Sequence, residues 1–216
     1  MHITVNNLIA IQNLLKKKNI SQVTPKIIAV SKTFPASKIL PLINHGHIHF
    51  GENKIQESID KWSDLKKQFT DLKLHMVGKL QTNKVKFAVK LFDYIHSVDT
   101  EKLARKIADE EIKQNKKVKI FIQVNIGNEK QKSGVNKNKL EDLFFYCKNL
   151  NLDVIGLMCI PPAGENTEEY FKETKILNQK LDLLELSMGM SSDYIKAIKY
   201  SSTYLRIGSS IFGNRV

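Results

Sequence analysis

The sequence predicts an α/β fold: a single-domain (β/α)8 TIM barrel over residues 1–216, with an extra N-terminal helix. Two observations support this prediction. Eight short apolar runs alternate with amphipathic helical segments, and polar residues follow nearly every run. In a closed barrel, all eight carboxyl ends of the strands meet at one mouth. The alternative is a doubly wound open sheet, whose outer strands would lie too far apart to share a site.

The predicted strands are short and apolar, as is typical of buried parallel strands. They cover residues 27–31, 48–51, 74–77, 94–98, 118–126, 154–160, 184–188 and 204–207. The polar residues at their carboxyl ends include Lys32, Asn53, Asp99, Asn125 and Arg206. These side chains are therefore expected around the barrel mouth.

The predicted helices lie between these strands, and one precedes the first. They cover residues 5–17, 36–44, 54–68, 83–90, 101–114, 137–149, 167–181 and 192–201. Residues 101–114 show the pattern well, because Leu103, Ala104, Ile107 and Ala108 recur at helical spacing.

Composition narrows the function classes. Hydrophobic residues make up 42% of the chain and charged residues 26%, which is typical of a globular protein. The net charge is +12, but the lysines are dispersed and no aromatic-interleaved basic motif occurs. We therefore expect a solvated charged surface and no nucleic-acid partner.

The sequence also indicates a compartment. The two cysteines, Cys147 and Cys159, lie in apolar contexts and do not form a disulfide framework, which fits a reducing environment. The N-terminus lacks the pattern of a signal peptide, and no apolar run approaches the ~20 residues of a membrane span. A cytoplasmic protein without a membrane partner is expected.

Lys32 ends the apolar run 27–31 and is the first candidate functional residue. A lysine at the carboxyl end of a buried strand lies where α/β proteins place their chemistry. When its amine is desolvated, it loses its charge easily and becomes a nucleophile toward aldehydes. The alternative is a structural lysine whose ammonium group reaches water.

The last two predicted strands end in residues suited to a phosphate group. After Arg206, Gly208 allows close backbone approach, and Ser209 begins an apparent helix whose N–H groups could bind an anion. One strand earlier, the run 187–192 repeats this chemistry, with Gly189 for a tight turn and Ser187, Ser191 and Ser192 for oxygen contacts. Each loop alone could be a glycine turn with a serine cap. Together with a lysine and an arginine, they predict a site for pyridoxal 5′-phosphate (PLP).

Other candidates are less specific. Asn53 could donate to a ligand oxygen or cap a helix, and His75 is expected to be a hydrogen-bonded core residue. Lys132 is either a second mouth lysine or a surface lysine. The sequence has no metal-ligand spacing of the His/Cys type, no P-loop and no nucleophile elbow.

Several stretches together make the sequence resemble the pyridoxal-phosphate homeostasis protein family. They occur in the family's order over nearly the whole chain. The matching stretches are 29–33, 50–57, 75–84, 96–99, 123–125, 132–134, 156–158, 186–191 and 206–213. The sequence departs from the family pattern at Lys54, where a tyrosine is usual, and at Ser209, where threonine is commoner.

The resemblance implies a barrel like the N-terminal domain of alanine racemase, with PLP held by a Schiff base on Lys32. It also implies that Arg206 faces the pyridine nitrogen and that Ser187, Gly208 and Ser209 hold the phosphate. Asn53 is included as a further cofactor contact.

The function implied is to bind PLP and to buffer or deliver it, with apo forms of PLP-dependent enzymes as partners and no catalytic residues. A monomer is expected. The chain ends at Val216, so the second, β-rich domain that brings a racemase its other base is expected to be missing. An arginine at the pyridine nitrogen also disfavours pyridinium formation. The alternative is a slow PLP-dependent racemase or lyase.

Overall fold

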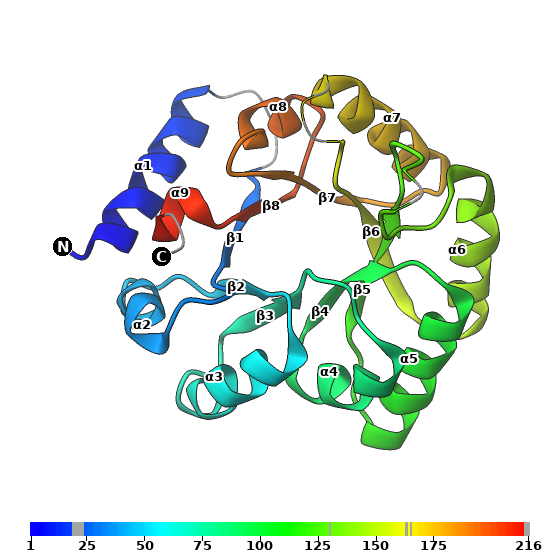
Figure 1. The fold of residues 1–216 in the computed structure, drawn as a ribbon, viewed down its shortest axis with the longest axis horizontal. Coiled ribbons are helices and arrows are strands. Elements are labelled where there is room, and N and C mark those ends of the chain that lie inside the picture. The colour runs from blue at the N-terminus through cyan, green and yellow to red at the C-terminus, as the bar shows by residue number, and fades with distance from the viewer. Residues whose placement is uncertain (19–23, 130, 163, 165, 214–216) are drawn as a thin grey trace.

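The computed structural model describes residues 1–18, 24–129, 131–162, 164 and 166–213, and they form a closed barrel (Figure 1). Each strand pairs in parallel with the next, and β8 closes the ring against β1. The strands are β1 (Lys26–Val30), β2 (His49–Glu52), β3 (Lys73–Met76), β4 (Tyr94–Val98), β5 (Lys119–Val124), β6 (Asp153–Cys159), β7 (Glu185–Met190) and β8 (Tyr204–Ile207). The predicted barrel is confirmed, and the open sheet is wrong.

Helices surround the barrel, and each predicted helix is present. They are α1 (Ile3–Lys18), α2 (Ala36–Asn44), α3 (Ile55–Gln68), α4 (Val85–Leu91), α5 (Glu101–Gln114), α6 (Leu140–Asn149), α7 (Thr167–Lys180), α8 (Tyr194–Lys199) and α9 (Ser209–Phe212). The 3₁₀ turns η1 (Thr82–Lys84) and η2 (Lys137–Lys139) precede α4 and α6. Local sequence sets the bounds of α5, because the Thr100 hydroxyl accepts the Leu103 N–H and Asn115 ends the helix in the left-handed conformation.

Two apolar layers follow from the alternation of side chains along each strand. On β1, Ile27 and Ala29 pack in the large cluster that also contains the buried faces of the helices. Ile28 and Val30 point the other way, into a small cluster with residues of β4, β5, β6 and β8, including Tyr94 and Phe121. The small cluster fills the barrel interior, so the barrel has a packed core beneath its mouth.

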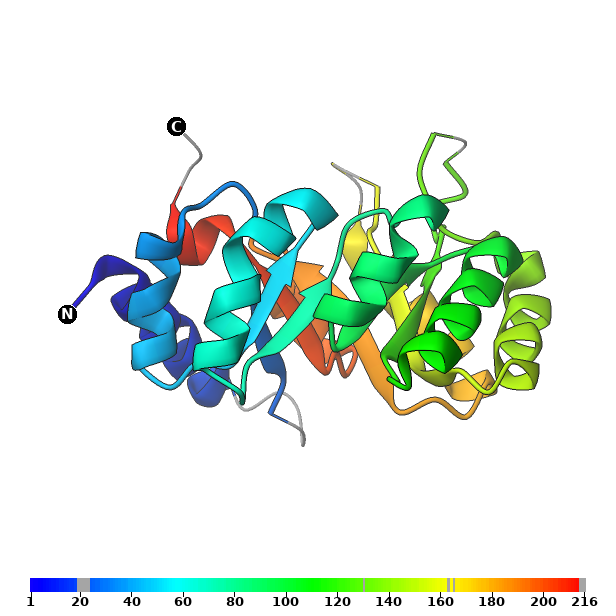
Figure 2. The same ribbon diagram turned by 90° about the horizontal axis from the view of Figure 1, so that it is seen from below.

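The carboxyl ends of the strands share one edge of the barrel. In the side view, α9 (red) lies at the upper edge, as does the loop that follows β5 (green) (Figure 2). The N-terminal helix α1 lies beside α9 and α2 (Figure 1). Candidate residues after β1, β7 and β8 are therefore brought to the same side of the molecule.

The main difference from the predicted elements concerns β7. Residues 189 and 190 continue this strand, although Gly189 was expected in a turn. Gly189 has φ +86°, and the pairing of β7 with β8 shifts register between Ser187 and Met190, so the strand contains an irregularity rather than an end. The loop after β7 therefore begins at Ser191.

Two sequence-based expectations on the wider molecule can be compared with the fold. Cys147 and Cys159 are both buried and free, as expected. In the part of the chain that the structure describes, no helix combines the length and the apolar character needed to cross a bilayer.

Candidate functional site

A cavity of about 690 Å³ opens at the mouth of the barrel, between the ends of β1, β7 and β8. Its volume lies within the range of small-molecule sites. It is lined by Val30, Lys32, Phe34, Val77, Ile160, Met190, Ser191, Ser192, Arg206, Gly208, Ser209, Ser210 and Gly213. The structure therefore brings four predicted site residues together, namely Lys32, Arg206, Gly208 and Ser209.

Hydroxyl groups form one side of this cavity. Ser191 and Ser192 follow β7, while Ser209 and Ser210 begin α9. The Ser191 Oγ atom accepts the backbone N–H groups of Gly208 and Ser210, each at 3.3 Å, and so joins the two loops. Because α9 has only four residues, the serine hydroxyls, rather than a long helix dipole, make this side suitable for an oxyanion.

Arg206 supplies a buried positive charge in the cavity wall. Only 5% of the residue is exposed, and its acceptors are neutral: the carbonyl and hydroxyl of Ser187, at 2.5 and 2.8 Å from Nη1, and the Cys159 carbonyl, 2.8 Å from Nη2. Burial lowers the pKa of Arg206, but a guanidinium remains charged in proteins. The cavity therefore presents a permanent cation that can donate hydrogen bonds and cannot accept them.

Ser187 does not lie where the sequence analysis expected it. It is fully buried within β7 and does not line the cavity. Its hydroxyl contacts Arg206 Nη1 and His96 Nδ1, each at 2.8 Å. The continuation of β7 through Met190 places Ser187 inside the barrel wall, and Ser191 and Ser192 line the cavity instead. Ser187 therefore links Arg206 to His96 within the barrel.

A chain of three histidines continues inward from Ser187. His96 Nε2 lies 2.9 Å from His75 Nδ1, and His75 Nε2 lies 3.0 Å from His49 Nδ1. The rings of His75 and His96 stack on Tyr94 and Phe121, respectively. His75 and His96 are fully buried, and this burial lowers the pKa of both well below 6.5. His75 is thus confirmed as a hydrogen-bonded core residue.

Comparison with known proteins fits this geometry. The family model described as "Alanine racemase, N-terminal domain" matches residues 6–216. A pyridoxal phosphate homeostasis protein of Aquifex aeolicus is 40% identical over 200 residues, which cover 88% of this chain and 87% of that protein. A protein of the same name from Haemophilus influenzae is 36% identical, with 95% and 91% covered. The chain belongs to the pyridoxal phosphate homeostasis protein family.

Solved structures of other proteins have the same fold. PipY of Synechococcus elongatus, solved without PLP, is 33% identical, with a TM-score of 0.89 over 98% of this chain and 100% of its own. PipY with PLP bound is 32% identical, with a TM-score of 0.86 over the same shares. Alanine racemase of Clostridium difficile is 18% identical, with a TM-score of 0.75, and this chain covers 57% of it. The racemase shares the barrel fold.

Two further residues singled out in the sequence analysis, Asn53 and Lys132, do not line the main cavity. Asn53 lines a neighbouring cavity of about 420 Å³, which also contains Lys54, Lys79 and Lys84. It does not cap α3, because Lys54 occupies that position. Lys132 pairs with Glu129 at 2.5 Å and does not line either cavity.

The sequence analysis included Ser191 and Ser192 in a candidate loop but chose Ser187 as the phosphate contact, and it missed His49 and His96. A signal for the histidines was present. His49, His75 and His96 fall in three consecutive strand-like runs, each as the second or third residue of its run. Side chains at similar depths in neighbouring barrel strands can contact one another inside the barrel.

Proposed function

We propose that this protein binds PLP through a Schiff base on Lys32, and that it buffers the cofactor or delivers it to apo PLP-dependent enzymes. The observation that carries the proposal is the mouth cavity, which is lined by a lysine, a buried arginine and four serines. The names of its relatives and the PLP-bound PipY structure support the same conclusion.

The cavity residues fit the parts of PLP. The Lys32 amine can add to an aldehyde carbon and form a C=N bond with loss of water. Arg206 can donate to an unprotonated pyridine nitrogen, since it has no lone pair with which to accept. Ser191, Ser192, Ser209 and Ser210 offer hydroxyl donors for the phosphate, and Gly208 lines the cavity beside them. Asn53 and Ser187 are not part of this proposed contact set.

The phosphate is expected to dominate the affinity. Each charge-assisted hydrogen bond to it contributes about 1.5–3 kcal/mol, so two such bonds correspond to a factor of roughly 10²–10⁴ in Kd. Pyridoxal, which lacks the phosphate, should therefore bind at least a hundredfold more weakly than PLP. Absorbance titrations of both compounds measure the ratio. Replacing both Ser209 and Ser210 with alanine should reduce the ratio of the Kd for pyridoxal to the Kd for PLP. Equal Kd values for the two compounds in the unmodified protein would contradict the phosphate site.

Arg206 favours a carrier over a catalyst. A guanidinium at the pyridine nitrogen disfavours protonation of the ring, and an unprotonated ring stabilises a carbanion at the substrate α-carbon poorly. Binding and release of the cofactor do not need that stabilisation. The expected activity is transfer of PLP to an apoenzyme, with at most slow exchange of α-protons in amino acids.

The test follows both activities in the cofactor-loaded protein. An apo transaminase should regain activity when it is mixed with the loaded protein, and more slowly when a dialysis membrane separates the two. Incubation with amino acids in deuterated water should give little α-deuteration. Rapid multiple-turnover racemisation, at the median enzyme rate of about 10 per second, would favour the racemase alternative.

A further inference from the structure

The backbone at Lys32 forms a tight turn with an unfavourable conformation. The Phe34 N–H donates to the Ser31 carbonyl at 3.1 Å and closes a four-residue turn. Thr33, the third residue of this turn, has φ +68°. Type II turns favour glycine at this position, and a β-branched residue there is strained. The turn therefore needs other contacts to hold it.

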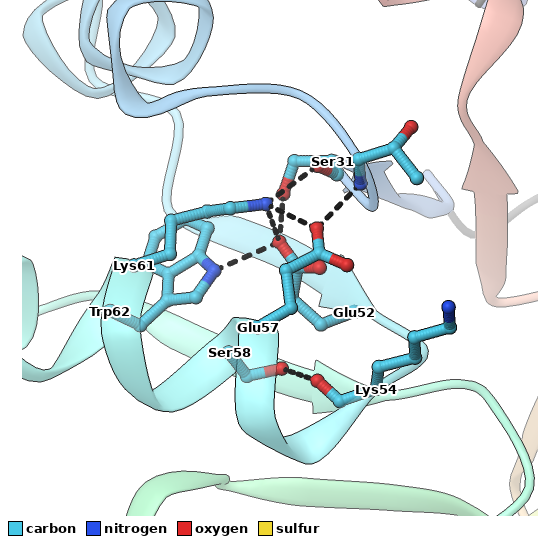
Figure 3. Close-up of polar contacts among 8 residues, drawn as sticks. Ser31, Glu52, Lys54, Glu57, Ser58, Lys61 and Trp62 are labelled. Atoms are coloured by element: carbon cyan, nitrogen blue, oxygen red, sulfur yellow. Dashed lines mark hydrogen bonds and ion pairs between the residues drawn. The ribbon is translucent and has the colours of Figure 1, made fainter.

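An ion pair on α3 supplies these contacts. Glu57 and Lys61 lie one helical turn apart, with Lys61 Nζ 2.9 Å from Glu57 Oε1. The Thr33 N–H donates to Glu57 Oε1 at 2.5 Å, and Lys61 Nζ donates to the Ser31 carbonyl at 3.0 Å (Figure 3). These two backbone groups belong to the peptide units on either side of Lys32. One ion pair therefore holds the peptide units on both sides of Lys32 by hydrogen bonds.

The ion pair is anchored in the core. Glu52 is fully buried, and its Oε1 atom accepts hydrogen bonds from Lys61 Nζ at 3.0 Å, Trp62 Nε1 at 2.9 Å and Ser31 Oγ at 2.8 Å (Figure 3). The Lys61 side chain is only 9% exposed. Burial raises the pKa of Glu57, but the hydrogen bonds from Lys61 and Thr33 outweigh it, so the net pKa lies below the ordinary value. Glu57 is therefore a carboxylate at neutral pH.

We propose that Glu57 and Lys61 are positioning residues that hold the turn at Lys32 so that its amine faces the cofactor cavity. Type I and type II turns differ in the orientation of the peptide between their second and third residues. Here that peptide joins Lys32 to Thr33, and its N–H is the group that Glu57 holds. Neither Glu57 nor Lys61 lines the cavity, so the effect proposed for them passes through the turn at Lys32. This inference rests on the proposed role of Lys32.

The first test compares Glu57→Ala with a matched control. Asp64→Ala breaks another ion pair of α3, between Asp64 and Lys67 at 2.9 Å. This pair is exposed and makes no hydrogen bond to the turn at Lys32 among the described residues. Glu57→Ala should slow formation of the borohydride-reducible PLP adduct at Lys32 by about tenfold or more, the factor for one lost charge-assisted hydrogen bond. Glu57→Gln keeps an oxygen acceptor for the Thr33 N–H, so it should slow adduct formation less than Glu57→Ala does. Asp64→Ala should leave the rate unchanged.

The second test separates positioning from general destabilisation. Glycine adopts φ +68° without steric cost, so Thr33→Gly should recover most of the rate in the Glu57→Ala background. Glycine at this position also removes backbone strain from the folded protein, so thermal unfolding is measured on the same variants, and a rate that changes without a matching change in Tm marks positioning. An unchanged rate in Glu57→Ala, or no recovery in the double variant, would overturn the proposal.

Amide hydrogen exchange at Thr33 in the cofactor-free protein keeps the inference distinct from the proposed function. Glu57→Ala should raise this exchange by about tenfold, whereas Asp64→Ala should not. If no variant, including the parent, forms an adduct at Lys32, the proposed function is overturned. If the parent forms the adduct and Glu57→Ala changes neither exchange nor rate, only the positioning role is overturned.

Discussion

Replacing Lys32 with alanine is expected to abolish the borohydride-reducible bond between this protein and PLP. Among the lysines of the chain, Lys32 alone lines the main cavity, as far as the described residues go. Glu57 and Lys61 hold the backbone groups on either side of Lys32, and Lys32 lines the cavity together with Arg206 and the serines. Removing the amine removes the nucleophile, and no other side chain in the cavity can form a C=N bond.

Peptide mass mapping after borohydride reduction tests this prediction. The parent protein should carry the pyridoxyl group on Lys32, and Lys32→Ala should carry none. Lys132→Ala is the matched control and should keep the adduct, because the Lys132 ammonium pairs with Glu129 outside the cavity. A yellow, reducible chromophore that persists in Lys32→Ala would move the attachment to another lysine, and Lys132 is the first to examine.

Acid is expected to unfold the protein at a pH where most carboxylates are still ionised. The pKa of His75 and of His96 is lowered well below 6.5, first by burial and then by charge, from neighbouring histidines and Lys26 at His75 and from Arg206 at His96. In the unfolded chain both rings take up a proton near pH 6.5. The unfolded state therefore binds more protons, and the stability that is complete above pH 6.5 is lost as the pH falls.

The expected slope is large. Two protons taken up on unfolding correspond to about 2.7 kcal/mol of unfolding free energy per pH unit below about pH 6. Burial also lowers the pKa of His47 and His49 to about 4, which adds to the slope in the same direction down to that pH. Urea unfolding at pH 7.5, 6 and 5 measures the effect. His75→Gln removes one of these protons and should reduce the slope by about 1.4 kcal/mol per pH unit. An unfolding free energy of the parent protein that stays constant between pH 7 and 5 would contradict the prediction.

The barrel could be predicted because its signals are local. Each strand is an apolar run of four to seven residues, and the helices between them carry an apolar face, as Glu101–Gln114 shows. The end of β7 could not be predicted in this way. Ser187 and Gly189 resemble a turn in sequence, but pairing with β6 and β8 keeps them in the sheet.

The part of the candidate site that local sequence signals mark was predicted, and the part that depends on packing between elements was not. Lys32, Arg206, Gly208 and Ser209 follow directly from strand ends in a barrel. The contacts of Glu57 and Lys61 with the turn at Lys32 depend on how α3 packs across β1 and β2, which no local pattern records. The histidine chain likewise depends on the depths of three side chains in neighbouring strands.

The hydrogen bonds that link Arg206 to the three histidines all donate in one direction, from the barrel mouth inward. The guanidinium can only donate to the Ser187 hydroxyl, so this buried hydroxyl uses its hydrogen toward His96 Nδ1. His96 then carries its hydrogen on Nε2 and donates to His75, which donates in the same sense to His49. A proton arriving at His49, the first residue of β2, could reach the mouth only by reversal of every link. The link from Arg206 to Ser187 cannot be reversed, so this chain of hydrogen bonds does not carry a proton from His49 to Arg206.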